Sequence, residues 1–231
     1  MGILVIGVIF MVISFAVSSR LKSKFRKYSE TPLSSNLSGR EVAELMLRDN
    51  RIYDVAVTCQ PGELTDHYNP VNRTVNLSEA VYYGRNAAAA AVAAHECGHA
   101  VQHATAYGML EFRNTLVPLQ NVSARILNFI VLASIFGGFF FFSVFPYDMV
   151  LLAVIGAYVV ITTFSVVTLP VEFDASRRAL VWINERGITL RHEQDMARDA
   201  LKWAAMTYVV AAVGSLVTLF YYITLFLGSR E

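Results

Sequence analysis

The stretch HECGH, residues 95–99, contains the residue types that bind and use a catalytic zinc ion. His95 and His99 are four residues apart, so on a helix their side chains lie on the same face. Two imidazoles at that spacing can take two sites of one tetrahedral Zn²⁺ per chain, leaving room for a third protein ligand and a water. Glu96 would project beside the metal, where a general base for that water belongs. The motif therefore predicts metal-assisted hydrolysis of peptide bonds.

A third metal ligand has to come from elsewhere, and the residues alone leave more than one candidate open. His103 continues the helical ladder, but a further turn moves it about 6 Å along the axis, which favours a hydrogen-bonding role around the site or simple packing. His67 lies on another segment, with no spacing that recommends it. Glu172 follows an apolar run and Pro170, where a carboxylate needs a partner. That partner is either a metal or an arginine such as Arg177.

The motif lies in an alanine-rich segment that predicts one long helix. We expect this helix to run from Asn86, a good N-cap residue, to near Gly108. So many alanines make a slender helix that neighbours can approach closely. Gly98 keeps its surface open near the metal, whereas Cys97 points away and is expected to be a small buried side chain.

The composition indicates a membrane protein with a modest water-soluble part. Of 231 residues, 55% are hydrophobic and only 16% charged, whereas soluble domains carry about 25% charged residues. A spanning helix needs about 20 consecutive apolar residues. Four runs meet or approach that length, at Gly2–Ser19, Ile126–Phe145, Met149–Leu169 and Ala204–Leu227. We therefore expect an anchor at 1–19, a helical hairpin at 126–169 and a C-terminal span at 204–227.

The distribution of basic residues predicts the orientation of these spans. Basic residues follow the first run instead of preceding it, which favours an uncleaved anchor whose downstream side faces the cytoplasm. The segment 170–203 is also rich in arginine, whereas the turn at Pro146–Asp148 has no lysine or arginine. Both segments 28–124 and 170–203 are thus expected to be cytoplasmic. The four runs contain no ionisable residue, which argues against a transporter or channel.

The segment 28–124 is long enough to fold as a domain. Ser38 and Glu41 have capping-box spacing ahead of an amphipathic helix. Strands are expected at Ile52–Cys59 and Arg73–Leu77, followed by a short helix and the long one. The predicted fold class is mainly α: about four membrane helices with a small α+β metallopeptidase domain, which carries the HECGH helix.

Several blocks of the sequence resemble the bacterial neutral zinc metallopeptidases of the membrane, the YugP type. The blocks are LTDHYNP, VNLSEAVY, AAAAVAAHECGHAVQHA, LPVEFDASRRAL and AAMTYVVAA, within residues 39–211. The resemblance implies a gluzincin-like site at the inner membrane, in which His95, His99 and Glu172 hold zinc and Glu96 is the base. The chain is more distantly similar to CaaX-type and HtpX-type membrane proteases. Those usually have an Asp four residues after the third ligand, where this chain has Ser176, with Asp174 two residues after it.

The segment before the zinc helix corresponds to the edge strand that pairs with substrate in related metallopeptidases. By that likeness Tyr68, Asn69 and Val71 are expected to line the substrate cleft, although a structural turn at Asn69 is an equal alternative. The donor that stabilises the developing oxyanion is not identified by the sequence; Tyr68, His192 and Arg177 are candidates.

The expected partners are a peptide or membrane-protein substrate and the lipid bilayer. A net charge of +1 gives no reason to expect nucleic acid, and two cysteines are too few for a disulfide framework. The main alternative is an inactive membrane assembly protein that keeps zinc for structure, but such a protein would not need Glu96. The oligomeric state and the natural substrate are not determined by the sequence.

Overall fold

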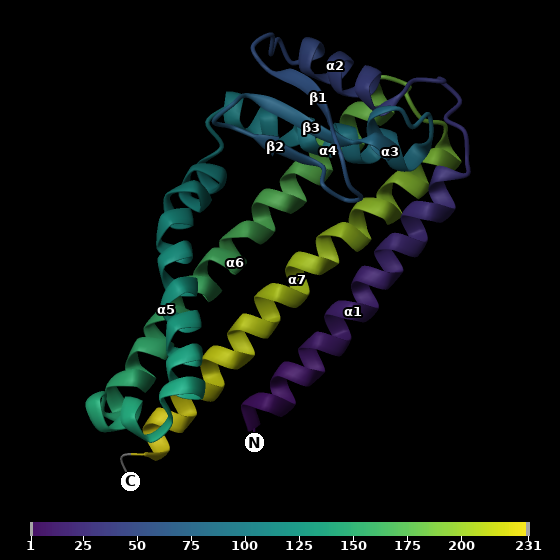
Figure 1. The fold of residues 1–231 in the computed structure, drawn as a ribbon. Coiled ribbons are helices and arrows are strands. Elements are labelled where there is room, and N and C mark those ends of the chain that lie inside the picture. Colours follow the sequence, from purple (N-terminus) through teal and green to yellow (C-terminus); the bar gives the residue numbers. More distant parts are fainter. Residues whose placement is uncertain (1, 230–231) are drawn as a thin grey trace. The chain divides into compact units, whose positions relative to one another are not determined.

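A computed structural model describes residues 2–229 of the chain (Figure 1). The described part is mainly helical, with one small sheet, as predicted. Its elements are α1 Gly2–Ser29, α2 Gly39–Asp49, β1 Ala56–Gln60, β2 His67–Asn69, β3 Thr74–Ser78, α3 Glu79–Tyr82, α4 Ala87–Ala104, α5 Gly108–Val144, α6 Tyr147–Glu185 and α7 Arg191–Gly228. The chain divides into two compact units, which we call the helical unit and the mixed unit.

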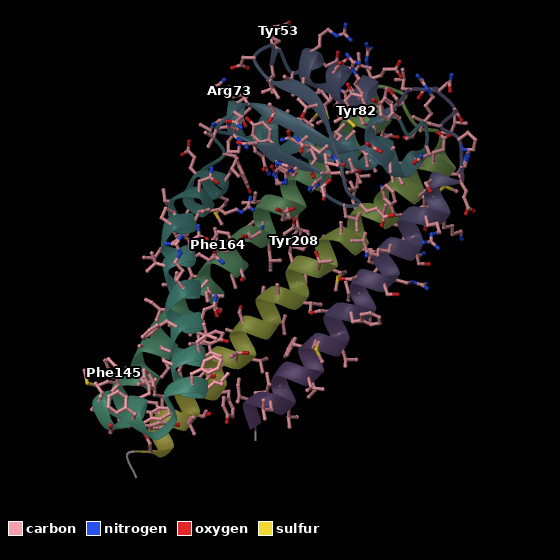
Figure 2. The ribbon with its side chains drawn as sticks, viewed as in Figure 1. Tyr53, Arg73, Tyr82, Phe145, Phe164 and Tyr208 are labelled. Carbon is pink, nitrogen blue, oxygen red and sulfur yellow. The ribbon has the colours of Figure 1, made fainter. Side chains whose placement is uncertain are left out.

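Within the described residues, the helical unit comprises 2–15, 112–169 and 208–229. Among the described residues, four helices are long and apolar enough to cross a membrane: α1, the Gly108–Gly138 part of α5, α6 and α7. Three of the four predicted runs lie wholly within these helices, whereas the run Ile126–Phe145 extends past an interruption at Gly138. Large apolar side chains such as Phe15, Phe136 and Phe140 are exposed, and so is Phe145, labelled in Figure 2. Apolar surface of this extent is what a lipid bilayer covers.

The second of these helices is longer than its apolar run. We expected a helix over Ile126–Phe145, whereas α5 begins at Gly108 and carries polar residues in its first turns. It is interrupted at Gly138, whose φ of 45° is a left-handed conformation that glycine adopts at little cost. The residues around Pro146 then form the predicted tight turn before α6.

The mixed unit comprises Ala16–Glu111 and Pro170–Thr207. The segments 28–124 and 170–203, which we expected to be water-soluble, overlap this unit, and their solubility stays a prediction. Its sheet has the strand order β1-β3-β2, with β1 parallel and β2 antiparallel to β3. The central strand β3 buries Val75 and Leu77 completely, while β2 is an edge strand. β1 starts at Ala56, four residues later than expected, because the chain bends at Asp54 and its pairing with β3 begins only at Ala56, opposite Thr74.

Helices α2 and α4 form the core of the mixed unit together with the sheet. The predicted capping box begins α2: Ser38 Oγ accepts from the amide of Glu41, and the carboxylate of Glu41 accepts from the amide of Ser38. Val42 and Met46 on this helix are buried against α4. Helix α4 also contacts strands β2 and β3 of the sheet, near which it is labelled in Figure 1.

Helix α4 carries the HECGH motif and begins as predicted. The Asn86 side chain accepts a hydrogen bond from the amide of Ala89 at 2.9 Å, which caps the helix. The alanines of its first turns are fully buried, as expected for a slender central helix. The helix ends at Ala104 and not near Gly108, because Ala106 takes a left-handed conformation that stops it.

Candidate metal centre

The two histidines of the motif lie one turn apart on α4, with their ring centroids 4.8 Å from each other. Both side chains are largely buried. The 3.6-residue period of the helix places both histidines on one face of α4. The opposite face is buried in the core, so the face that carries the histidines is turned toward α6.

Helix α6 brings Glu172 to this pair. Its Oε2 lies 3.4 Å from Nε2 of His95 and 3.6 Å from Nε2 of His99. The candidate ligand atoms of the three residues all lie within 4.8 Å of one another. Glu172 is only 2% exposed, and its Oε2 has no hydrogen-bond partner. A buried carboxylate oxygen without a hydrogen-bond donor normally needs a cation.

The electrostatics of the three groups fit that need. Burial by itself raises the pKa of Glu172, but the imidazoles of His95 and His99 outweigh it and hold the pKa well below its usual range. Burial likewise lowers the pKa of His99, yet the interaction with Glu172 and the charge of Glu96 leave it raised. The carboxylate of Glu172 and the imidazole of His99 thus each stabilise the charged form of the other. A metal cation that binds between them would take the place of the proton on the imidazole.

The close approach of α6 to α4 depends on Gly98. A Cβ at this position would lie 2.7 Å from the backbone oxygen of Ala175 and 3.1 Å from its Cα. No side chain fits in that space, so the glycine lets α6 pack directly on the face that carries both histidines. Glu172 lies one turn before Ala175 and is positioned by this contact.

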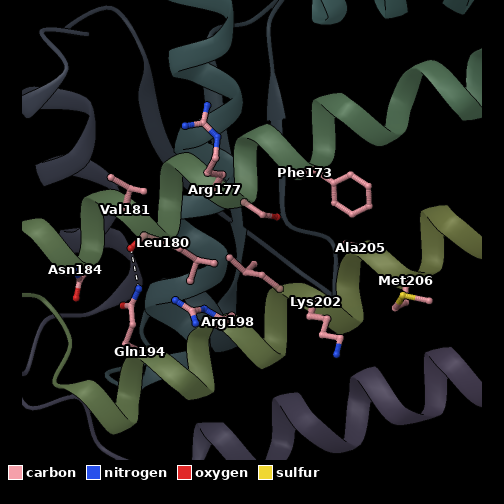
Figure 3. Close-up of a pocket in the computed structure, with 12 residues that line it drawn as sticks. Phe173, Arg177, Leu180, Val181, Asn184, Gln194, Arg198, Lys202, Ala205 and Met206 are labelled. Carbon is pink, nitrogen blue, oxygen red and sulfur yellow. Dashed lines mark hydrogen bonds between the residues drawn. The ribbon is translucent and has the colours of Figure 1, made fainter.

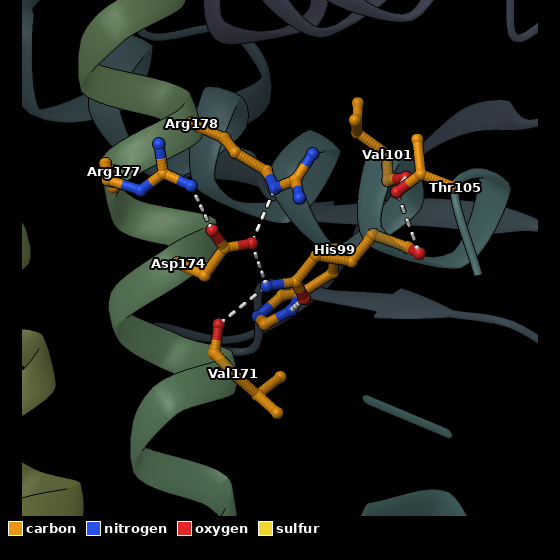
Figure 4. Close-up of polar contacts among 8 residues, drawn as sticks. His99, Val101, Thr105, Val171, Asp174, Arg177 and Arg178 are labelled. Carbon is orange, nitrogen blue, oxygen red and sulfur yellow. Dashed lines mark hydrogen bonds and ion pairs between the residues drawn. The ribbon is translucent and has the colours of Figure 1, made fainter. Parts of the chain in front are cut away.

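The outer nitrogen of each imidazole is already engaged. His99 Nδ1 lies 3.0 Å from Oε1 of Gln102, a fully buried side chain. The amide nitrogen of Gln102 donates to the backbone oxygen of Val171 at 2.8 Å and to Asp174 at 3.0 Å (Figure 4). His95 Nδ1 lies 3.1 Å from Oγ of Ser176. Partners at both Nδ1 atoms leave both Nε2 atoms to face Glu172, which is the arrangement of metal-binding histidines.

The residues present therefore fit a zinc ion. Two imidazole nitrogens and one carboxylate oxygen are the protein ligands of many catalytic zinc sites, in which the fourth position remains open. The fit rests on the convergence of the three side chains, on the unpartnered oxygen of Glu172 and on the oriented rings.

Glu96 lies beside this cluster and is also buried. Its Oε2 accepts a hydrogen bond from the backbone amide of Tyr68 at 2.9 Å. Tyr68 belongs to the edge strand β2, so the carboxylate of Glu96 lies against the edge of the sheet. This is where a base would contact a peptide bound along that edge.

Comparison with known proteins identifies the family to which the chain belongs. A family model described as "Putative neutral zinc metallopeptidase" matches residues 3–227. The chain belongs to this family. The Bacillus subtilis (strain 168) protein named "Putative membrane protease YugP" is 38% identical over 219 residues, which cover 95% of this chain and 94% of that protein. No solved structure matches. The resemblance predicted from the sequence blocks is confirmed.

The sequence did not predict the contacts that two polar residues, Gln102 and Ser176, make with the histidines of this metallopeptidase family member. Gln102 is three residues after His99 on the same helix, and that spacing is the signal that could have identified it. Ser176 stands where more distant proteases usually have an Asp, and its hydroxyl is the partner of His95 Nδ1. Asp174 contacts the cluster only through Gln102.

The other histidines do not join the cluster. His103 Nδ1 lies 2.8 Å from the hydroxyl of Tyr68, so it connects α4 to the edge strand. His67 is exposed and contacts the backbone oxygen of Thr65 and the side chain of Asn76. His192 is also exposed.

The residues expected to line a substrate cleft differ in their surroundings. The Asn69 side chain accepts from the amides of Val71 and Asn72, which fixes the turn after β2. The side chain of Val71 projects into solvent and is 89% exposed. Tyr68, which contacts both Glu96 and His103, is the one of the three that links the strand to α4.

Proposed function

We propose that this protein is a membrane zinc endopeptidase that hydrolyses peptide bonds at the cytoplasmic surface of the bacterial inner membrane. The observation that carries the proposal is the buried cluster of His95, His99 and Glu172 with Glu96 beside it. Membership of the zinc metallopeptidase family and the membrane-length helices support it.

His95, His99 and Glu172 would hold the zinc ion, one per chain. A bound zinc ion lowers the pKa of water to about 7 and polarises a carbonyl group. Gln102 and Ser176 fix the imidazole rings through their Nδ1 atoms, and Gly98 keeps α6 close enough for Glu172 to reach them. In this gluzincin-like domain, α4 and α6 thus supply all the ligands.

Glu96 would move the proton. One of its oxygens is held by the amide of Tyr68, so the other is free to accept the proton of the attacking water. The same carboxylate then donates that proton to the amine that leaves when the C–N bond breaks. The buried position of Glu96 excludes competing water from this transfer.

The proposed membrane arrangement rests on the sequence. Spans within 1–19, 126–169 and 204–227 would leave 28–124 and 170–203 in the cytoplasm, where lysine and arginine concentrate. Glu172 follows the third apolar run by only three residues. Membrane proteins, their juxtamembrane segments and released peptides are therefore the proposed substrates.

The test is proteolysis by the purified full-length chain in detergent, with Glu96→Gln and Glu111→Gln beside the wild type. Loss of a general base costs about 10²–10⁴-fold in rate, so Glu96→Gln should keep its zinc and lose cleavage of a casein-type substrate. Glu111→Gln neutralises an exposed glutamate and should cleave as the wild type does. A wild type that binds zinc but cleaves neither casein nor membrane-protein substrates would instead support the inactive assembly protein.

A further inference from the structure

A groove of about 700 Å³ lies between α6 and α7 within the mixed unit (Figure 3). Its α6 wall includes the apolar side chains of Phe173, Leu180 and Val181. Ala205 and Met206 on α7 complete the apolar surface at one end. At the other end Gln194 donates a hydrogen bond to the backbone oxygen of Leu180, which joins the two helices.

The polar residues of the groove give it a positive charge. Arg177, Arg198 and Lys202 are among the twelve residues that line it, and none of the twelve is acidic. Arg198 and Lys202 are one helical turn apart on α7. Figure 3 shows the Arg198 side chain between the two helices, beside Leu180.

The cations differ in how far they are already neutralised. Arg177 is paired with Asp174, a neighbour on its own helix. Within residues 2–229, no carboxylate lies at ion-pair distance from Arg198 or Lys202; Asp199, next to Arg198 in the sequence, pairs with Lys24 at 2.7 Å. Arg198 therefore offers the groove a planar donor whose positive charge has no partner.

The groove borders the candidate metal centre through Ser176. This residue lines the groove, and its hydroxyl lies 3.1 Å from Nδ1 of His95. Ser176 lies one turn after Glu172 on α6, so a peptide bound in the groove would lie about one helical turn from that ligand. Ser176 thus marks the place where the lining of the groove comes into contact with a proposed ligand.

We propose that the groove selects peptide substrates with an acidic side chain flanked by apolar residues, the carboxylate pairing with Arg198 and Lys202. This proposal rests on the endopeptidase function above and adds its substrate preference. The apolar wall would take the flanking residues, while the pairing in a half-enclosed groove would discriminate against a basic residue at the same place.

The test uses internally quenched peptides of one sequence, in which Glu, Gln or Lys is placed at each position in turn around the cleaved bond. With the wild type, one position should favour Glu over Lys by about tenfold or more in kcat/KM. Arg198→Gln should weaken the preference at that position because Lys202 remains, and Arg198→Glu, whose carboxylate would neutralise Lys202 one turn away, should abolish it. Arg191→Glu makes the same charge change on an exposed residue of α7 outside the groove and should leave the preference intact.

Zinc content and thermal unfolding of each variant separate a change in preference from misfolding. An active wild type with no charge preference at any position overturns the inference and leaves the endopeptidase function standing. Failure to cleave any peptide, with zinc bound, counts against both. If activity instead requires phosphatidylglycerol vesicles and Arg198→Glu removes only that requirement, the groove binds lipid headgroups and the substrate proposal is wrong.

Discussion

Replacing Gly98 by alanine is a sensitive perturbation of the candidate metal centre, although it touches none of the proposed ligands. The added methyl group would lie 2.7 Å from the backbone oxygen of Ala175, whereas ordinary contact begins at 3.4 Å. Helix α6 would therefore have to move away from α4 by about 0.7 Å, unless both helices share the displacement. Because Glu172 lies one turn from Ala175, its carboxylate would move with the helix.

That displacement is small for the fold but large for a metal site. Overpacking costs about 1–3 kcal/mol, and the better helix propensity of alanine returns about 1 kcal/mol of it. Metal–ligand distances, in contrast, tolerate only about 0.2 Å. Gly98→Ala should thus lower the midpoint of thermal unfolding by only a few degrees while weakening zinc binding by roughly 10- to 100-fold, the range seen when supporting residues are altered.

The assay is a zinc titration of the metal-free protein against a competing chelator, with proteolysis measured in parallel. Gly156→Ala is the matched control, since a Cβ at that position on α6 meets nothing within 4 Å. It should bind zinc as the wild type does. If Gly98→Ala also retains wild-type zinc affinity and activity, the contact between Gly98 and Ala175 does not position Glu172, and the reasoning fails.

Three further predictions concern the supports of the site and fold. Gln102→Met removes the partner of His99 Nδ1 from a fully buried position. It should weaken zinc binding by about 10- to 100-fold in the same titration, and unchanged affinity would show that Gln102 does not position the ring. In the Ser38–Glu41 capping box, hydrogen bonds from Ser38 and the charge of Arg85 hold the pKa of Glu41 below its ordinary value of 4.5. A carboxylate whose pKa is lower in the folded state stabilises the fold when the pH is above its unfolded pKa. This stabilisation is lost as the pH falls through the folded pKa. The wild type should therefore unfold at a higher temperature than Glu41→Gln at pH 7. The gap should narrow as the pH falls below 4.5, and a gap that stays constant on acidification would contradict the ionic cap. Removal of zinc by a chelator should abolish proteolysis reversibly and destabilise the protein, by about 2.7 kcal/mol relative to protein in zinc at one hundred times its Kd; an unfolding temperature that ignores zinc would contradict a site in the folded state.

Much of the fold was predictable because its signals are local. The four apolar runs, the capping box of Ser38 and Glu41, and the N-cap at Asn86 each depend on residues close together in sequence. At the end of α4, a single backbone conformation moved the predicted boundary. Ala106 ends α4 four residues before Gly108, and no propensity of alanine indicates its left-handed φ.

The candidate site was predictable to the extent that it lies on one helix. The i, i+4 spacing of His95 and His99 and the place of Glu96 between them require only a helix. The position of Glu172 next to them depends on how α6 packs on α4, which no local pattern specifies. The resemblance to the family suggested it, and the contact at Gly98 gives the physical reason.

The residues that contact the proposed ligands and their surroundings were harder to predict from the sequence. Gln102 could have been identified from its spacing to His99, but its contacts with Asp174 and Val171 lie on another helix. The contact of Ser176 with His95 depends on the same packing of two helices. His103 was predicted to hydrogen-bond near the site or to pack; it contacts the hydroxyl of Tyr68.

The central claim is that Glu172 completes a zinc site with His95 and His99. The most direct measurement is the zinc content per chain, by mass spectrometry of the metal, in wild type, Glu172→Ala, His103→Ala and His67→Ala purified in parallel. The account predicts one zinc in the wild type and in both histidine variants, and loss of zinc in Glu172→Ala. Zinc retained in Glu172→Ala but lost in His103→Ala or His67→Ala would contradict it and assign the third ligand to that histidine.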